Sequence, residues 1–415
     1  MDGSRRGCRS GGAGSHDRMS GRWSYLVFMM AAGMVTASLI RVSAAQAPAA
    51  QPTRGRTLYL KHCAACHGEK GDGNGIAAPF LFPKPRDFRF GRFRLVSTSS
   101  GVPTKADLDA VLKRGMPGSA MPPWYFLSDA DRSALIDEVL RLFRVGLRES
   151  YIARYKEEEQ LSDEELAEEL KDPDFQAEID DFVTSRTTPG ELTEVPPLGK
   201  PSPEVIAEGK RLYVKQGCVS CHGEKGVGDG VKKMVDDEGY PTRPRDFTRG
   251  IFKGGHDPAS LYRRTAYGMR GTPMPATVNL KPSEIAAIVH WMRSLSDEAT
   301  RQAAVIRRRQ IDVVRVSAIP AGYPFDDAIW NKAAAVPMQV IPVWWRDDMS
   351  IDLRVQAVHD GDDIMFRLQW KDATWSKTSH RTNDFPDAVA IQIAQAGDEP
   401  FLGMGSADSP VDIWY

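Results

Sequence analysis

Cys63-Ala64-Ala65-Cys66-His67 and Cys218-Val219-Ser220-Cys221-His222 determine how this chain of 415 residues is organised. Each motif stands in a longer stretch that occurs twice. Residues 55–75 (GRTLYLKHCAACHGEKGDGNG) match residues 209–230 (GKRLYVKQGCVSCHGEKGVGDG) at an offset of about 155 residues. Two copies of one stretch predict two domains of the same fold.

The similarity continues downstream of both motifs. Pro85-Arg86-Asp87-Phe88 matches Pro244-Arg245-Asp246-Phe247, and the pattern G-M-x-G-[ST]-x-M-P occurs at 115–122 and at 268–275. Each copy then closes with apolar residues at helical spacing. These are Leu135, Ile136, Val139, Leu140 and Phe143 in the first copy and Ile285, Ile288, Val289 and Met292 in the second. Each unit is therefore predicted to have a helix before the cysteines, a loop-rich middle and a helix at its end.

The motif C-x-x-C-H is typical of covalent haem attachment. Two thiols add to the haem vinyl groups, and the adjacent histidine becomes the fifth ligand of the iron. A redox dithiol or half a zinc site is the alternative for C-x-x-C. Against both, histidine follows at once in each copy, and Cys8 is the only other cysteine. We therefore predict two haem c groups, with Cys63, Cys66, Cys218 and Cys221 in the thioether bonds and His67 and His222 on the iron.

The sixth iron ligand is expected to be methionine, because a thioether closes the open position and raises the reduction potential relative to two imidazoles. Each copy offers two candidates, Met116 or Met121 and Met269 or Met274. We predict Met121 and Met274, since each stands directly before a proline whose fixed φ helps to hold the sulfur. Met116 and Met269 are then packing residues, with the reverse assignment as the alternative.

Composition places the chain among soluble globular proteins of two or three domains. Hydrophobic residues make up 41% and charged residues 26% of the sequence, and the mean hydropathy of −0.38 argues against a polytopic membrane protein. The formal net charge of −1 indicates no nucleic-acid partner.

The first 47 residues have the layout of an export signal. Five arginines in residues 5–22 precede an apolar run from Trp23 to Ile40 and the small-residue pattern Ala45-Gln46-Ala47. We expect cleavage there, which would also remove Cys8, and a periplasmic location or one on the periplasmic face of the cytoplasmic membrane. An uncleaved membrane anchor is the alternative, because about 18 apolar residues can span a bilayer.

Composition shifts mark the remaining boundaries. Residues 149–194 hold 16 acidic against 4 basic residues, which predicts a solvated helical or disordered linker, with a docking surface for a basic partner as the alternative. Alternation of apolar and polar residues at 364–370 and at 389–393 predicts β-strands after residue 316. The predicted segments are a signal peptide at 1–47, domains at 53–146 and 201–297, linkers at 147–200 and 298–315, and a β-sandwich-like domain at 316–415. The last domain ends inside an apolar run, so we expect it to be incomplete.

Each repeat resembles a class I cytochrome c over its whole length, in its first helix, C-x-x-C-H motif, late Met-Pro and closing helix. This resemblance implies two mainly α-helical cytochrome c domains. The recurring Pro-Arg-Asp-Phe resembles a segment of some relatives, which implies that Arg86 or Arg245 lies near a haem propionate; a surface turn is the alternative.

The C-terminal segment resembles the haem b-binding γ subunit of ethylbenzene dehydrogenase. The resemblance is carried by residues 326–330 leading into Val336-Pro337, by the predicted strand at 364–371 and by 401–405 with 411–415. In that family a methionine and a lysine hold a non-covalent haem b, and the sandwich partners molybdopterin enzymes of the dimethyl sulfoxide reductase type. Met404 matches the methionine, whereas the lysine would lie beyond Tyr415.

These observations predict an exported electron-transfer protein rather than an enzyme. Its expected partners are the molybdopterin and iron–sulfur subunits of an oxidoreductase and other electron carriers, with membrane association through the N-terminal segment or a complex. The alternatives are a dihaem peroxidase, a haem-based sensor that uses the acidic segment, and the cytochrome subunit of a membrane alcohol dehydrogenase. Two Met-Pro sites argue against the peroxidase, and a β-sandwich tail argues against the alcohol dehydrogenase subunit.

Overall fold

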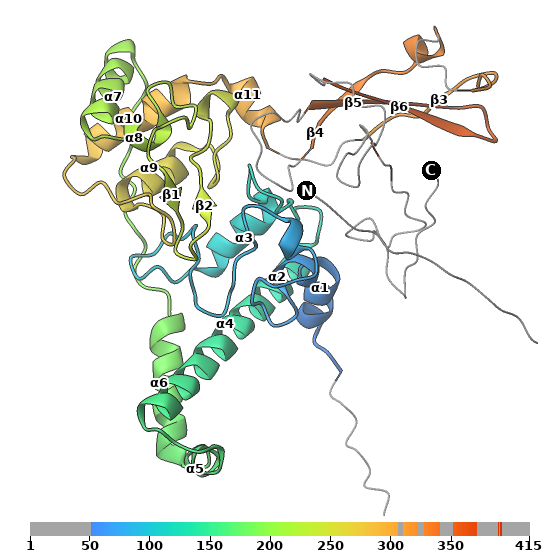
Figure 1. The fold of residues 1–415 in the computed structure, drawn as a ribbon. Coiled ribbons are helices and arrows are strands. Elements are labelled where there is room, and N and C mark those ends of the chain that lie inside the picture. The colour runs from blue at the N-terminus through green and yellow to red at the C-terminus, as the bar shows by residue number, and fades with distance from the viewer. Residues whose placement is uncertain are drawn as a thin grey trace, which may run out of the picture. The chain divides into compact units, whose positions relative to one another are not determined.

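Figure 1 shows the computed structural model, which describes residues 51–305, 310–322, 328–340 and 352–371, with 389 and 391. The predicted signal peptide at 1–47 and Met404 lie outside these residues. Among the described helices, none combines the length and the apolar character that a membrane span requires.

The two repeats form the same series of helices. In each, a helix leads into a short turn of helix that carries the motif histidine, a third helix follows the loops, and a fourth closes the unit, as predicted for the first and last. The helices are α1 (Arg54–His62), α2 (Ala64–His67), α3 (Lys105–Arg114) and α4 (Asp129–Glu158) in the first repeat and α7 (Pro203–Lys215), α8 (Val219–His222), α9 (Pro258–Tyr267) and α10 (Pro282–Ser294) in the second. Short 3₁₀ turns lie at η1 (Ala78–Phe80) and η2 (Phe247–Arg249), and a two-residue strand pair, β1 (Met234–Val235) and β2 (Pro241–Thr242), lies in the second repeat.

Helices α3 and α9 were not predicted, because the middle of each unit was expected to be loop. Their starts carry clear capping residues: Thr104 and Asp107 form a capping box at α3, and Asp257 caps α9 ahead of Pro258. Each helix has 10 residues and leads directly into the G-M-x-G-[ST]-x-M-P loop. The two helices therefore define where both candidate methionine loops begin.

The first and last helices of each repeat cross in close backbone contact. A Cβ atom on Gly55 of α1 would lie 2.3 Å from the carbonyl oxygen of Ala134 in α4, and one on Gly209 of α7 would lie 2.0 Å from that of Ala287 in α10. Only glycine permits such an approach at these two equivalent positions. The crossing packs the first helix of each repeat against the closing helix of the same repeat.

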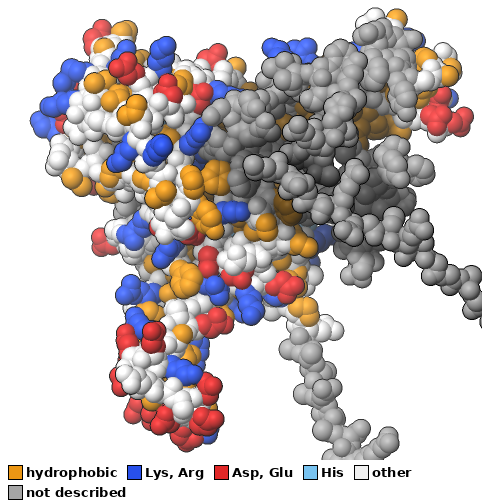
Figure 2. Space-filling view, in the orientation of Figure 1, with side chains coloured by type: hydrophobic (Ala, Val, Ile, Leu, Met, Phe, Trp, Pro, Cys, Tyr) orange, Lys and Arg blue, Asp and Glu red, His pale blue; other side chains and the backbone are white. Residues whose placement is uncertain are grey.

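The acidic segment between the repeats is helical. Helix α4 runs without a break across the predicted domain boundary at residue 147. The short helix α5 (Asp163–Glu169) lies at the turn, and α6 (Pro173–Thr187) folds back beside α4. Tyr151, Phe175 and Ile179 are buried between α4 and α6 and form a small core of their own. Figure 2 shows acidic side chains crowded around the end of this hairpin, where α5 lies. The segment thus takes the helical form of the predicted linker rather than the disordered one.

The described C-terminal residues form a four-stranded sheet, after a short helix α11 (Glu298–Ala303). Strand β5 (Asp352–His359) is central: β6 (Ile364–Trp370) pairs with it antiparallel on one edge, and β4 (Val336–Gln339) antiparallel and β3 (Val314–Arg315) parallel on the other. The predicted strand at 364–370 is confirmed. A 3₁₀ turn, η3 (Ala328–Lys332), buries Ile329 and Trp330 against this sheet. The rest of the predicted sandwich, including most of the alternating run at 389–393, falls outside the described residues.

Candidate haem-binding sites

Each repeat has one cleft that gathers the residues predicted from its motifs. The first is lined by Cys63, Cys66, His67, Met116 and Met121, and the second by Cys218, Cys221, His222, Met269 and Met274. Residues far apart in the sequence, from the motif helix and from the loop after the third helix, therefore meet at one place in both repeats.

Apolar side chains make up most of the remaining walls of both clefts. They are Leu81, Phe93, Leu112, Trp124 and Ile136 in the first and Phe247, Phe252, Leu261, Ile288 and Met292 in the second. The second cleft encloses about 560 Å³, within the roughly 300–1,000 Å³ of cofactor pockets, and the first encloses about 160 Å³. The first cleft is the smaller of the two.

The His67 ring is oriented for ligation of a metal through Nε2. Its Nδ1 lies 3.0 Å from the carbonyl oxygen of Arg86. A carbonyl can only accept, so Nδ1 carries the proton and Nε2 keeps its lone pair. The ring also stacks on Phe88 at 4.4 Å between centroids, and burial lowers the pKa of His67, which keeps the imidazole neutral.

His222 has the same surroundings with one difference. Its ring stacks on Phe247 at 4.9 Å, and burial lowers its pKa to about 4. The Nδ1 atom is buried and makes no hydrogen bond within the described part of the chain. The second repeat therefore also holds a neutral imidazole, but no hydrogen bond within the described residues fixes which ring nitrogen carries the proton.

The motif cysteines are free thiols, and burial suppresses the ionisation of three of them. Burial raises the pKa of Cys63 to about 12, and it also raises the pKa of Cys66 and of Cys218. A redox-active C-x-x-C site has the opposite character, because its reactive thiol needs a lowered pKa. The environment thus favours the haem interpretation over the dithiol one.

Both methionine loops are closed by the same hydrogen bonds. Met116 N–H donates to the carbonyl of Met121 at 3.1 Å, and Met269 N–H donates to that of Met274 at 3.1 Å. A hydroxyl inside each loop, from Ser119 or its counterpart Thr272, donates to the first methionine's carbonyl at 2.7 Å. All four methionines line the clefts, so the choice of Met121 and Met274 as ligands stays a prediction.

Two buried tyrosines were missed as site residues, although both lie in the repeated stretch. Tyr59 donates its hydroxyl to the carbonyl of Gly68 at 2.7 Å, and Tyr213 donates to that of Gly223 at 2.6 Å. Both rings are almost wholly inaccessible. Each bond ties the first helix of the repeat to the residue after the motif histidine and so fixes the position of that histidine.

Replacing Tyr213 by Phe is expected to lower the free energy of unfolding by about 1–3 kcal/mol, because a buried carbonyl loses its donor while the packing is kept. Tyr240→Phe in the same repeat is the matched control, since Tyr240 is 40% exposed, and it should cost less than about 0.5 kcal/mol. Urea unfolding of the three proteins measures the difference. Equal stabilities for the two variants would contradict the role assigned to Tyr213.

Taken together, the clefts fit covalently attached haem. Each brings two cysteines, a neutral histidine and methionine sulfurs to one apolar cavity, and the His67 tautomer leaves Nε2 available. These are the residue types that haem c requires.

Comparison with known families agrees with this reading. Residues 50–137 match the family of cytochrome c oxidase, cbb3-type, subunit III; residues 206–296 match cytochrome c; and residues 327–415 match ethylbenzene dehydrogenase. The chain thus contains two cytochrome c domains followed by a C-terminal ethylbenzene dehydrogenase domain, which confirms the predicted order. Two such domains with their cysteine pairs imply two haem c groups.

Two individual proteins are similar to parts of this chain. A protein of Haloferax mediterranei, assigned as a respiratory nitrate reductase heme subunit (ORF7), is 35% identical over 92 residues, which cover 21% of this chain and 33% of that protein. The chain therefore matches only a third of that relative's length. A solved structure of a reducing HAO-like protein complex from Kuenenia stuttgartiensis shows 30% identity, covers 59% of this chain and 97% of that one, and has a TM-score of 0.47.

Proposed function

We propose that this protein is an exported two-haem c electron carrier that serves a molybdopterin oxidoreductase of the dimethyl sulfoxide reductase type, as its cytochrome subunit or its electron-transfer partner. The observation that carries the proposal is the presence of two equivalent clefts, each with a C-x-x-C-H motif and a closed methionine loop. A cleft that could supply both a histidine and a methionine to one iron suits electron transfer rather than turnover of a substrate at the metal.

The chain's own residues would do three things in each cleft. Haem, when bound, supplies the reversible one-electron change of its iron. Cys63 and Cys66 tether the cofactor, and His67 offers Nε2 while the Arg86 carbonyl holds its Nδ1–H. Met121 would supply a second protein ligand to the iron, and the apolar walls would exclude water. In the second repeat Cys218, Cys221, His222 and Met274 take the same roles.

The partner is inferred from the C-terminal domain and the curated relative. The matching family is named for ethylbenzene dehydrogenase, and the relative for a nitrate reductase heme subunit. Both names denote oxidoreductases, and the second denotes a haem subunit of one, which supports a role as an electron-transfer component. A haem b held by Met404 in the C-terminal domain, and a periplasmic location through residues 1–47, belong to the same proposal.

Purification of the tagged full-length chain from the cells that produce it tests the proposal. We expect molybdenum to copurify in a fixed ratio to haem c, and both haems to titrate reversibly without peroxide consumption. Measurable peroxidase rates with a high-spin ferric haem would overturn the electron-carrier assignment. Reversible haems in a preparation free of molybdenum would overturn the assigned partner alone.

A further inference from the structure

The repeated Pro-Arg-Asp-Phe motif is not a surface turn, although a turn was one alternative from the sequence. The side chain of Arg86 is only 13% exposed, and Arg245 is 7% exposed. The two arginines occupy equivalent positions in the repeats, and both clefts are lined by Arg245. Such burial of guanidinium groups requires specific partners.

Arg245 finds its partner in the opposite repeat. Its Nε donates to the carbonyl of Pro117 at 3.1 Å, and this contact is buried. Pro117 and Gly118 form the turn of the first methionine loop. A Cβ atom on Gly118, which has φ of +75°, would lie 2.5 Å from Arg245 Nε, so glycine alone lets the arginine approach so closely.

The contact reaches Met121 through a short closed ring of backbone. Ser119 N–H donates to the carbonyl of Met116 at 3.0 Å, and Met116 N–H donates to that of Met121 at 3.1 Å. Pro117 therefore belongs to a loop whose two methionines are hydrogen-bonded to each other. Fixing the Pro117 carbonyl restrains the whole loop, including the backbone of Met121.

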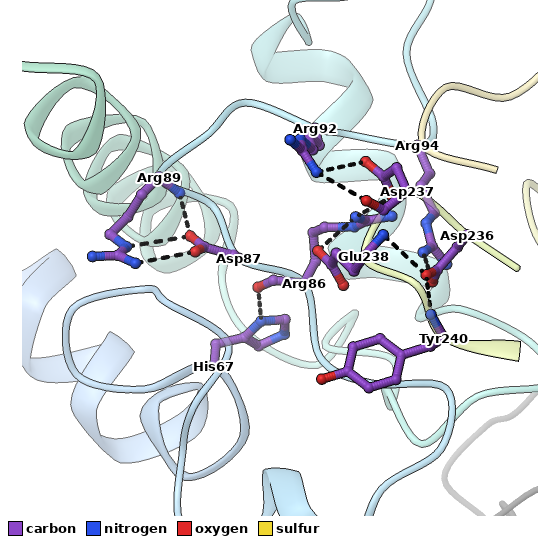
Figure 3. A network of polar contacts seen from close by, with 10 residues as sticks. All are labelled: His67, Arg86, Asp87, Arg89, Arg92, Arg94, Asp236, Asp237, Glu238 and Tyr240. Atoms are coloured by element: carbon purple, nitrogen blue, oxygen red, sulfur yellow. Dashed lines mark hydrogen bonds and ion pairs between the residues drawn. The ribbon is translucent and has the colours of Figure 1, made fainter. Parts of the chain in front are cut away.

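Arg86 of the first repeat reaches into the second, where it bonds residues that adjoin the second methionine loop. Its Nη1 bonds Asp237 at 3.1 Å and Glu238 at 2.8 Å in the second repeat, as Figure 3 shows. Its Nη2 lies 3.1 Å from where a Cβ on Gly271 would stand, and Gly271 is the counterpart of Gly118 in the second methionine loop. Asp237 N–H points to the Gly271 carbonyl at 3.5 Å, so Asp237 links Arg86 to that loop.

Further ion pairs hold the two repeats in this arrangement. Arg94 pairs with Asp236 at 2.6 Å, and both side chains are less than a tenth exposed; Arg92 pairs with Asp237 at 3.3 Å. Arg264 of the second repeat donates to the carbonyl of Arg94 at 3.2 Å. Buried pairs of this kind depend on their partners strongly, because either charge left alone is costly. The crossing is thus a built interface rather than a chance contact of surface side chains.

We propose that Arg86 and Arg245 are positioning residues that act across the two repeats: Arg245 holds the first methionine loop directly, and Arg86 holds the second through Asp237. The sixth ligand of each haem then depends on the other domain. The proposal rests on the proposed function, since it takes Met121 and Met274 as the ligands. It makes the two cytochrome domains one electron-transfer unit rather than two independent carriers on a linker.

Variants of the full-length holoprotein that keep only one of the two predicted ligand methionines allow the absorbance of each haem to be observed separately. Met274→Ala leaves the weak far-red sulfur–iron absorbance to the first-repeat haem, and Met121→Ala leaves it to the second. Adding Arg245→Leu is expected to abolish the remaining band in the Met274→Ala background and to spare it in the Met121→Ala background. Arg86→Leu should do the reverse. Arg249→Leu, which removes an exposed charge close to Arg245, should spare the band in both.

Haem content is measured on every variant. If the Arg245→Leu chain loses haem, Arg245→Lys replaces it, because lysine keeps the positive charge but lacks the Nε–H. If replacing an arginine affects only the band of its own repeat, or neither band, the proposed positioning across the two repeats is wrong, while the electron-carrier proposal stays intact. If neither methionine variant alone weakens the far-red absorbance, the axial assignment fails, and the proposed positioning falls with it.

Discussion

Alanine at both Cys218 and Cys221 is expected to give a chain with one covalent haem c in place of two. Both thiols line the second cleft, and the thioether bonds are the only covalent attachment that the motif provides. The first repeat keeps Cys63 and Cys66 and its own core, so its haem should remain. A pyridine haemochrome of the acid-extracted polypeptide measures the covalent haem directly.

Two controls accompany this experiment. Cys63→Ala with Cys66→Ala should also leave one haem, which would then belong to the second repeat. Cys8→Ala should leave both haems, because Cys8 belongs to neither motif. Two covalent haems in the Cys218/Cys221 double variant would contradict the attachment sites assigned here.

Replacing Met274 by His is expected to lower the reduction potential of one haem on the order of 0.1 V, within the roughly 0.8 V range that axial ligands span. Two imidazoles favour the ferric state relative to imidazole and thioether. The far-red absorbance of that haem should vanish, while the other haem keeps its potential. Met121→His should act in the same way on the first-repeat haem. A spectroelectrochemical titration resolves both steps.

Met116 and Met269 provide the matched controls, because they line the same clefts and belong to the same closed loops. His at either position should leave both potentials and both far-red bands in place, provided the variant retains two haems. Loss of the band in Met269→His but not in Met274→His would reverse the ligand assignment in the second repeat.

The sequence allowed the first and last helices of each repeat and the motif residues of each cleft to be predicted, because both rest on local patterns. The C-x-x-C-H motif fixes three residues within one turn of helix, and the spacing of Ile285, Ile288 and Met292 places one face of α10 in the core. The prediction that the methionines lie in the same clefts as the C-x-x-C-H motifs depended on comparing the two repeats.

The contacts between the repeats could not be predicted in this way. Arg245 bonds a carbonyl 128 residues earlier in the chain. The spacing of apolar residues in the sequence carries no information on how two domains dock. The tyrosine bonds were within reach, since Tyr59 and Tyr213 recur at matching positions, yet a recurring aromatic residue is usually ordinary core. For the acidic segment, its charge left a helical and a disordered linker open, whereas the spacing of Phe175 and Ile179 on α6 pointed to a buried helix face.

A pyridine haemochrome spectrum of the purified full-length protein tests the central claim most directly. The account predicts haem c at two per polypeptide, bound so that acid acetone does not extract it, with any haem b appearing as a separate, extractable component. A colourless polypeptide, or one with zinc at both cysteine pairs, would contradict it.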